Sequence, residues 1–123
     1  MKLKNLIILL GLAVLFSTAA TAQTYKYIGA AKCKMCHNKP DKGEQFKVWE
    51  AGPHAKAMEA LQGDEKNDPT CLKCHSTAGS VDSGLLAGLK ADEGVSCESC
   101  HGPGSHYKSA AIMKNKKWPF QKE

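Results

Sequence analysis

The feature that most constrains this chain is a short pattern that occurs three times, two cysteines separated by two residues and followed at once by a histidine. The three copies are Cys33-Lys-Met-Cys36-His37, Cys71-Leu-Lys-Cys74-His75 and Cys97-Glu-Ser-Cys100-His101, and together they use all six cysteines. On one helical turn, this spacing brings both thiols and the imidazole to neighbouring positions. The pattern is typical of c-type haem attachment.

Haem attachment gives each residue of the pattern a role. Two thiols form thioethers with the two vinyl groups of one haem, and the histidine becomes the proximal ligand of its iron. We therefore expect three covalently attached c-type haems, bound through Cys33, Cys36, Cys71, Cys74, Cys97 and Cys100. The expected proximal ligands are His37, His75 and His101.

Two other uses of the cysteines have to be weighed. A zinc ribbon would bind one ion with two of the cysteine pairs, but it would leave the third pair idle and the histidines unexplained. A disulfide framework suits an exported chain with an even number of cysteines, but it gives no reason for a histidine after every pair. Three copies of the full pattern in one short chain favour haem attachment over both.

The N-terminus has the three parts of a secretory signal peptide. Lys2 and Lys4 form a positive start, residues 6–16 are apolar, and Ala20-Thr21-Ala22 supplies small residues for cleavage. We expect residues 1–22 to be removed by cleavage after Ala22. The apolar run is too short to span a bilayer comfortably, although an uncleaved leader would anchor the chain. We therefore expect a periplasmic or otherwise extracytoplasmic protein without a membrane span after cleavage.

The mature chain, residues 23–123, has the length of one domain, which we expect to be a trihaem cytochrome c domain. The 17 basic residues are all lysines, and without the two in the leader 15 of them face 12 acidic residues. Lysine lacks the planar fork with which arginine recognises phosphates and bases, so we expect no nucleic-acid partner. The propionates of the haems should bring the holoprotein to a neutral or acidic net charge.

Two further histidines, His54 and His106, are candidates for second ligands of the haem irons. A packing or surface role is usual for a lone histidine, but three irons in so small a chain favour ligation. Because two such histidines face three irons, at least one iron cannot have two histidine ligands. Met35, Met58 and Met113 are alternative ligands for that iron, although packing is their commoner role.

The surroundings of the two histidines predict how they are presented. His54 follows Gly52-Pro53, which is typical of a helix start, and small alanines beside it would let a haem approach closely. His106 follows the turn Gly102-Pro103-Gly104 and lies five residues after His101. At that separation it barely reaches round its own haem, so it should serve a different one.

We expect a mainly α fold with extensive loops, in which the haems form the core. Helices are expected at about residues 44–49, 53–62 and 108–117, and loops at 63–70 and 76–94. No alternation of apolar and polar residues predicts a strand.

Two longer stretches carry a resemblance to known proteins. They are Trp49-Glu-Ala-Gly-Pro-His54-Ala-Lys-Ala-Met58-Glu-Ala-Leu61 and Gly94-Val-Ser-Cys97-Glu-Ser-Cys100-His101-Gly-Pro-Gly104. With the first two haem motifs, the chain resembles over most of residues 32–106 the small tetrahaem cytochromes of nitrifying bacteria, the cytochrome c-554 and c-prime-like family. Those proteins accept electrons from hydroxylamine oxidoreductase, so the resemblance implies a redox-protein partner.

The resemblance also implies which histidines share an iron. It gives His106 to the iron of His37, and His54 to the iron of His101. It leaves the iron of His75 with an open distal position and packs the first and third haems face to face. The family has a fourth haem further along, whereas this sequence has no further cysteine. We therefore expect a member without the fourth haem, whose second haem is exposed or covered by a partner chain.

Together these inferences predict an extracytoplasmic electron carrier that works between redox proteins, either cytochromes or a respiratory oxidoreductase, and we assign no catalytic residue. One alternative is a reductase of nitric oxide, nitrite or hydroxylamine at an open second haem. Its proton donors would be Lys73, Asp82, Glu98, Tyr107 or water. Another alternative is a haem-bearing subunit of a larger respiratory complex or filament, which would make the protein an oligomer.

Overall fold

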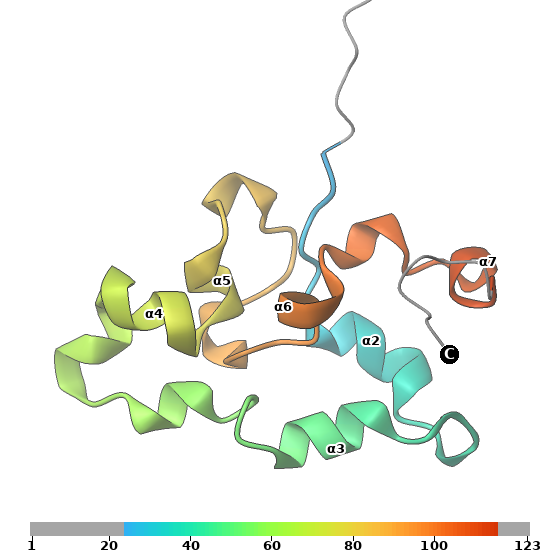
Figure 1. The fold of residues 1–123 in the computed structure, drawn as a ribbon, viewed down its shortest axis with the longest axis horizontal. Helices are drawn as coiled ribbons and strands as arrows, with labels where there is room; N and C mark the ends of the chain where they lie inside the picture. The colour runs from blue at the N-terminus through green and yellow to red at the C-terminus, as the bar shows by residue number, and fades with distance from the viewer. Residues whose placement is uncertain (1–23, 116–123) are drawn as a thin grey trace, which may run out of the picture.

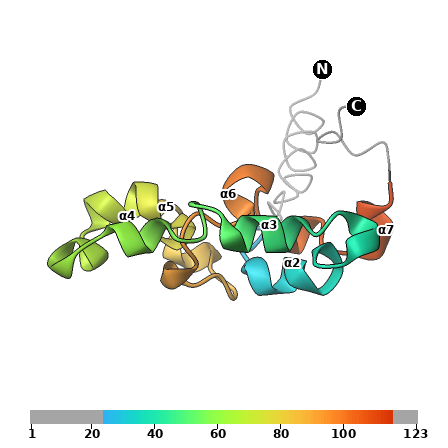
Figure 2. The ribbon, with the colours of Figure 1, turned by 90° about the horizontal axis from the view of Figure 1, so that it is seen from below.

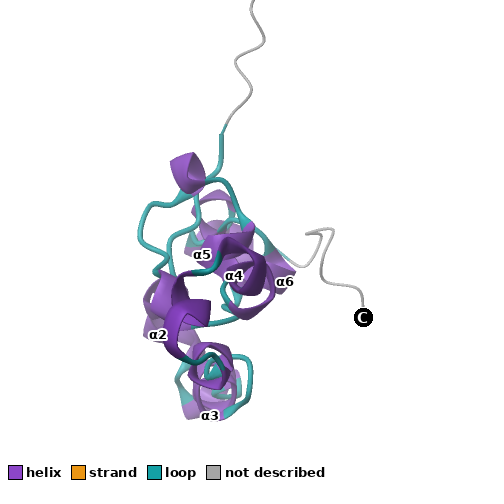
Figure 3. Cartoon of the chain, turned by 90° about the vertical axis from the view of Figure 1, so that its left-hand side faces the viewer, coloured by secondary structure: helices purple, strands orange, loops and turns teal. Residues whose placement is uncertain are grey.

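The structure, a computed structural model, describes residues 24–115, so the predicted signal peptide lies outside the described residues. Short helices joined by long loops make up this part of the chain (Figures 1 and 3). The α-helices within it are α2 (Ala30–His37), α3 (Gln45–Ala51), α4 (Pro69–His75), α5 (Thr77–Ser80), α6 (Glu98–His101) and α7 (Ala110–Met113). The 3-10 helices are η1 (Pro40–Lys42), η2 (Ala57–Ala60), η3 (Gly63–Asn67), η4 (Ser83–Leu85), η5 (Ala91–Glu93) and η6 (Gly104–His106). The predicted mainly α fold with extensive loops is confirmed.

The elements are spread along one long axis. Helices α4 and α5 pack together at one end, and α2 packs on α3 toward the other, with α6 between the two groups (Figures 1 and 2). Helices α2 and α4 each contain one of the three cysteine-histidine motifs, and α6 contains the third except for Cys97, which is its N-cap. The second motif therefore lies at one end of the described chain, the third near its middle and the first toward the opposite end.

The helix predicted at residues 53–62 is wrong. Helix α3, which confirms the helix predicted at 44–49, ends at Ala51, and Gly52 is extended with φ −84° and ψ 170°. A residue before proline is pushed out of the helical region, and Pro53 follows Gly52, so the chain turns instead of continuing as a helix. Residues 53–56 form a turn, and within the predicted range 53–62 only η2 is helical.

The predicted loops hold more helix than expected, and the terminal helix holds less. Residues 63–70 include η3 and the start of α4, and residues 76–94 include α5, η4 and η5. Side-chain caps explain two of these starts, because Asp68 accepts from the N–H of Thr70 and Ser76 accepts from the N–H of Gly79. Helix α7 is shorter than the predicted 108–117, of which the last two residues lie outside the described part. Within residues 24–115 the β structure amounts to an isolated bridge between Tyr27 and Leu86.

The apolar core of the described chain is small. Its buried apolar residues are Ile28, Ala30, Phe46, Leu61 and Leu89. The largest fully buried side chains are instead polar or charged, namely Glu98, Thr77 and Ser76. Because buried polar groups are costly unless they form hydrogen bonds, the partners of these three side chains decide how the loops are held.

The carboxylate of Glu98 joins three segments of the chain at one point. It is 1% exposed and accepts hydrogen bonds from the N–H of Ile28 at 3.0 Å, of Gly29 at 2.8 Å and of Gly104 at 2.6 Å. A Cβ atom at Gly104 would lie 2.9 Å from the same carboxylate and 2.8 Å from the Ile28 side chain, so a larger residue would have to displace these two buried side chains. Glu98 thus holds the segment before α2 and the turn after α6 against the third motif.

Thr77 joins the second motif to the third in a similar way. Its N–H donates to the carbonyl of Gly94 at 2.9 Å, and its hydroxyl oxygen accepts from the N–H of Ser96 at 2.8 Å. The same hydroxyl lies 2.5 Å from the hydroxyl of Ser99. Since Thr77 follows α4 directly and Ser99 lies in α6, these bonds fix the two motif-bearing helices relative to each other.

Replacing Glu98 with alanine should destabilise the haem-loaded protein strongly. The variant leaves three buried N–H groups without an acceptor, and we expect a loss of about 3 kcal/mol or more in the free energy of unfolding. Urea unfolding followed by circular dichroism measures the change. The matched control is Glu59→Ala, because Glu59 is exposed in η2, and it should change stability by less than about 0.5 kcal/mol. Equal effects of the two variants would contradict the role assigned to Glu98.

Candidate functional site

Each of the three cysteine-histidine motifs ends its helix at the histidine. Helix α2 ends at His37, α4 at His75 and α6 at His101. In every pair the first cysteine is half-buried and the second is exposed, and all six thiols are free. Each motif therefore presents one thiol and one imidazole near a helix end and a second thiol one turn earlier, a local arrangement that follows from the spacing alone.

The first and third motifs meet at their first cysteines. A side-chain hydrogen-bonding interaction with Cys97, with burial and the nearby carboxylates of Glu98 and Glu93, raises the pKa of Cys33 above its usual range. The same interaction lowers the pKa of Cys97. Burial, with the nearby charges of Cys33 and Glu98, also raises the pKa of Tyr107. Two motifs that are far apart in the sequence thus share one half-buried contact.

Helix α2 begins on carboxylates that belong to the chain around the third motif. The N–H of Ala30, the first residue of α2, donates to Glu93 at 2.7 Å, and the two preceding N–H groups donate to Glu98. The first N–H groups of a helix lack partners within the helix and carry partial positive charge, so carboxylates stabilise this end. The orientation of the first motif is thereby tied to residues 93–98.

His75 has a defined hydrogen bond to the backbone. Its Nδ1 lies 2.8 Å from the carbonyl oxygen of Ala57. Because a carbonyl can only accept, Nδ1 carries the proton and the lone pair is on Nε2. His37 has a longer contact of the same kind, with Nδ1 3.4 Å from the side-chain oxygen of Gln45. Such an outer hydrogen bond is typical of histidines that bind a metal through the other nitrogen.

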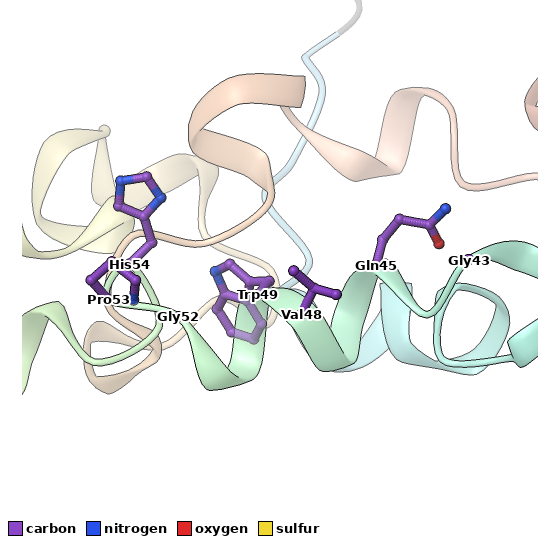
Figure 4. A pocket seen from close by; sticks show the side chains of 7 residues that line it. All are labelled: Gly43, Gln45, Val48, Trp49, Gly52, Pro53 and His54. Carbon is purple, nitrogen blue, oxygen red and sulfur yellow. The ribbon is translucent and has the colours of Figure 1, made fainter.

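His54 lies in the turn after α3, not in the first turn of a helix as the sequence predicted. It is exposed and lines an open pocket of about 460 Å³, whose other lining residues are Gly43, Gln45, Val48, Trp49, Gly52 and Pro53. Its imidazole projects from the turn, and Trp49, Val48 and Gln45 project to the same side of α3 (Figure 4). Val48 is 70% exposed, so the pocket has an apolar wall next to a potential ligand.

The backbone of His54 is hydrogen-bonded to the segment that leads into the third motif. Its carbonyl accepts from the N–H of Val95 at 2.9 Å, and the indole N–H of Trp49 donates to the carbonyl of Val95 at 2.9 Å. Gly94 has φ +65°, and a Cβ atom there would lie 2.5 Å from the carbonyl oxygen of His54. Glycine is therefore needed for this close approach, which brings His54 beside the third motif.

His106 lies in η6 and is joined to the segment that leads into α2. The N–H of Ser105 donates to the carbonyl of Lys26 at 3.2 Å, and the N–H of Lys26 donates to the hydroxyl of Ser105 at 2.7 Å. The Tyr25 ring stacks on the imidazole of His106. His106 is thus near the first motif's helix in the fold, although it is close to the third motif in the sequence.

Several residues of the site were not found by sequence reasoning. Tyr25 and Glu93 carry no signal of their own, and Gly94 entered only as the first residue of a stretch that carries the family resemblance. Each of the three acts through a contact with a residue far along the chain. Glu98 was named only as a proton donor, although a charged side chain inside a cysteine pair could have suggested a structural bond. Among the residues that the structure describes, no group of three or more histidine, cysteine and acidic side chains is placed to hold a metal ion by itself.

Replacing Gly94 with alanine should displace the His54 turn. Its φ of +65° and ψ of −144° suit only glycine, and the new methyl group would clash with the carbonyls of His54 and Ala55. We expect a loss of about 3 kcal/mol in the free energy of unfolding, measured in urea. Gly63→Ala is the control, because Gly63 has φ +49° with no atom within 4 Å of a Cβ, and it should lose only about 1 kcal/mol. Equal losses would exclude the proposed close contact as the cause.

Comparison with known proteins gives two matches. Residues 32–102, which contain all three motifs and His54, match the model of the family described as cytochrome c554 and c-prime. The chain is also 31% identical to cytochrome c-554 of Nitrosomonas europaea, in an alignment that covers 79% of this chain and 47% of that protein. The chain thus spans about half the length of this relative. No solved structure matches the chain significantly.

Proposed function

Because the chain belongs to the cytochrome c554 and c-prime family, we propose that it is a trihaem c-type cytochrome that carries electrons between redox proteins outside the cytoplasm. The observation that carries this proposal is the threefold motif, in which every histidine ends its helix and every pair of thiols lies on the preceding turn. Family membership supports covalent c-type haem and redox partners. The number of haems and their ligands are our own inference from the residues.

The donor set fits three covalently attached haems. When bound, a haem supplies an iron that exchanges one electron at a time, with a potential set by its ligands and surroundings. Six free thiols in three pairs match two thioethers per haem. The distribution of the pairs over three separate helices suits three cofactors better than one zinc ion, which needs four ligands at a single point.

The hydrogen bonds of the motif histidines support their role as proximal ligands. The Nδ1–H of His75 is bound to the carbonyl of Ala57 at 2.8 Å, which leaves Nε2 for the iron and fixes the ring. The side chain of Gln45 offers His37 a weaker acceptor. Ala57 belongs to the same turn region as His54, so the chain around one proposed distal ligand also orients the proximal ligand of another haem.

The contacts of His54 and His106 support the pairs His101 with His54 and His37 with His106. The turn of His54 is bonded to Val95, two residues before the third motif begins. His106 lies beside the segment that enters the first motif's helix. With both histidines used, the second haem has His75 and no other histidine. The contact of Cys33 with Cys97 favours close packing of the first and third haems.

The fold favours a relay over a reductase. Of the proton donors considered for an open second haem, Glu98 is buried and accepts three N–H groups, and Tyr107 donates to a carbonyl at 3.2 Å. Both lie at the first and third motifs, away from His75. Asp82 accepts from a backbone N–H at 2.7 Å in a turn of its own. Only Lys73, which is exposed on α4, lies on the helix of the second motif. A subunit role in a larger complex or filament is kept as the third alternative.

Export through a cleaved signal peptide is part of the proposal. The leader and the cleavage position after Ala22 lie outside the described residues. Within residues 24–115, none of the helices is long and apolar enough to cross a bilayer. Thioether haems and a redox partner outside the cytoplasm agree with this location.

The haem-loaded protein should be reduced by dithionite and reoxidised by a second c-type cytochrome, because iron with two histidine ligands has no vacant position and exchanges electrons without binding substrate. Stopped-flow absorbance of the haem bands measures both steps. Mass spectrometry of the same sample should show three haems, and the double variant Cys71→Ala with Cys74→Ala should carry two. A protein that is reduced but never reoxidised by any cytochrome would contradict the electron-carrier proposal, and another haem count would contradict the trihaem assignment.

Electron paramagnetic resonance of the fully oxidised protein should show about one high-spin haem in three, since the second iron lacks a second histidine. His54→Ala should convert one further haem to high spin, and so should His106→Ala. The double variant should leave no low-spin haem. Three low-spin haems in the unmodified protein would instead mean that a methionine, a lysine or a neighbouring chain ligates the second iron, and the reductase alternative would then be excluded.

A further inference from the structure

The ring of Tyr25 lies flat against the imidazole of His106. The ring centroids are 3.9 Å apart and the planes differ by 21°, which is a stacked pair. Both side chains are half-buried. Both residues lie outside residues 32–102, the range that matches the family model.

The backbone holds the two rings in this position. Tyr25 and His106 are next to Lys26 and Ser105, which exchange two hydrogen bonds at 2.7 and 3.2 Å. Ile28, three residues after Tyr25, and Gly104, two residues before His106, both donate their N–H groups to the carboxylate of Glu98. These hydrogen bonds fix the two segments to each other next to the stacked rings. The backbone positions of Tyr25 and His106 are therefore set by the fold.

Stacking decides something that the backbone leaves open. The outer torsion of a histidine side chain is broad and has no single preferred value, so the imidazole plane can rotate unless a neighbour selects one orientation. A flat aromatic ring at 3.9 Å selects the orientation parallel to itself. For an axial ligand this plane matters, because residues around a metal ligand orient it and thereby tune the metal.

We propose that Tyr25 is a positioning residue for the first haem, and that it sets the plane in which the imidazole of His106 faces the iron. The proposal rests on the proposed function, in which His106 is the distal ligand paired with His37. Tyr25 itself does not touch the iron. Its ring sets the relative orientation of the two imidazoles, which determines the low-spin ferric spectrum and contributes to the reduction potential of that haem.

The test uses the haem-loaded, exported protein with four variants. His106→Ala identifies which low-spin resonance belongs to the first haem. Tyr25→Leu removes the stacking ring, and Tyr25→Phe keeps it. Tyr27→Leu is the matched control, because Tyr27 lies in the same segment but its backbone pairs with residues 85–87 and not with the turn of His106. Mass spectrometry checks that every variant carries the same number of haems as the unmodified protein.

We expect Tyr25→Leu to shift or broaden the g values of the resonance that His106→Ala removes, and to shift the reduction potential of that haem, with the count of low-spin haems unchanged. Tyr25→Phe and Tyr27→Leu should leave both readouts as in the unmodified protein. An unshifted resonance in Tyr25→Leu would overturn the proposal while the ligation by His106 stands. If His106→Ala removes no low-spin resonance, the ligand assignment itself fails, and the role of Tyr25 fails with it.

A second measurement needs no substitution and covers the case in which Tyr25→Leu does not fold. In nuclear magnetic resonance spectra of the fully reduced protein, the ring protons of Tyr25 should show nuclear Overhauser contacts to the imidazole protons of His106. Their presence supports the stacked arrangement in the haem-loaded state, and their absence overturns the proposal.

Discussion

The arrangement of this chain depends on the hydrogen bonds that the buried carboxylate of Glu98 accepts. A buried charge is costly unless it is fully bonded, and here three backbone N–H groups satisfy it, two from the distant segment before α2 and one from the turn just after α6. The carboxylate also satisfies N–H groups that precede α2 and would otherwise be buried without acceptors. One side chain inside the third motif therefore decides where the first motif's helix begins and where the turn carrying His106 lies.

Hydrogen bonds between buried polar groups hold the loops of this chain in place, a role that an apolar core has in other small domains. The described chain buries few apolar side chains, whereas Thr77, Ser76 and Glu98 are almost inaccessible to solvent. Through Thr77 the second motif is bonded to the third, and through Glu98 the third motif is bonded to the first. Hydrogen bonds thus link the second motif to the third and the third to the first. Because hydrogen bonds are directional, they fix the relative orientation of the helices better than a few apolar contacts would. A fixed geometry of this kind is what the proposed electron transfer between haems would require.

The same loops that hold the motifs also present the candidate distal ligands. The His54 turn is pressed onto the chain that enters the third motif, and the carbonyl of Ala57 a few residues later meets His75. The prediction of a helix from residue 53 failed because Gly52 and Pro53 end α3 and turn the chain. The error does not remove His54 from the site. A turn exposes the imidazole beside Val48 and Trp49, and close packing of Gly94 against the turn fixes its position.

The sequence by itself determined the local arrangement of each motif, from which haem attachment is predicted, because one helical turn brings two cysteines and a histidine at this spacing together. It also determined the mainly α class, the position of α3 and the number of candidate ligands, because these depend on local pattern and composition. The resemblance already implied that His54 serves the third motif and His106 the first, but the tertiary structure alone decided that Glu98 is a structural bond and not a proton donor at the second haem, and that Tyr25 stacks on His106. These depend on contacts between residues about 70 to 80 positions apart. No local pattern encodes such a contact, since its partners are chosen by how the whole chain satisfies its buried polar groups.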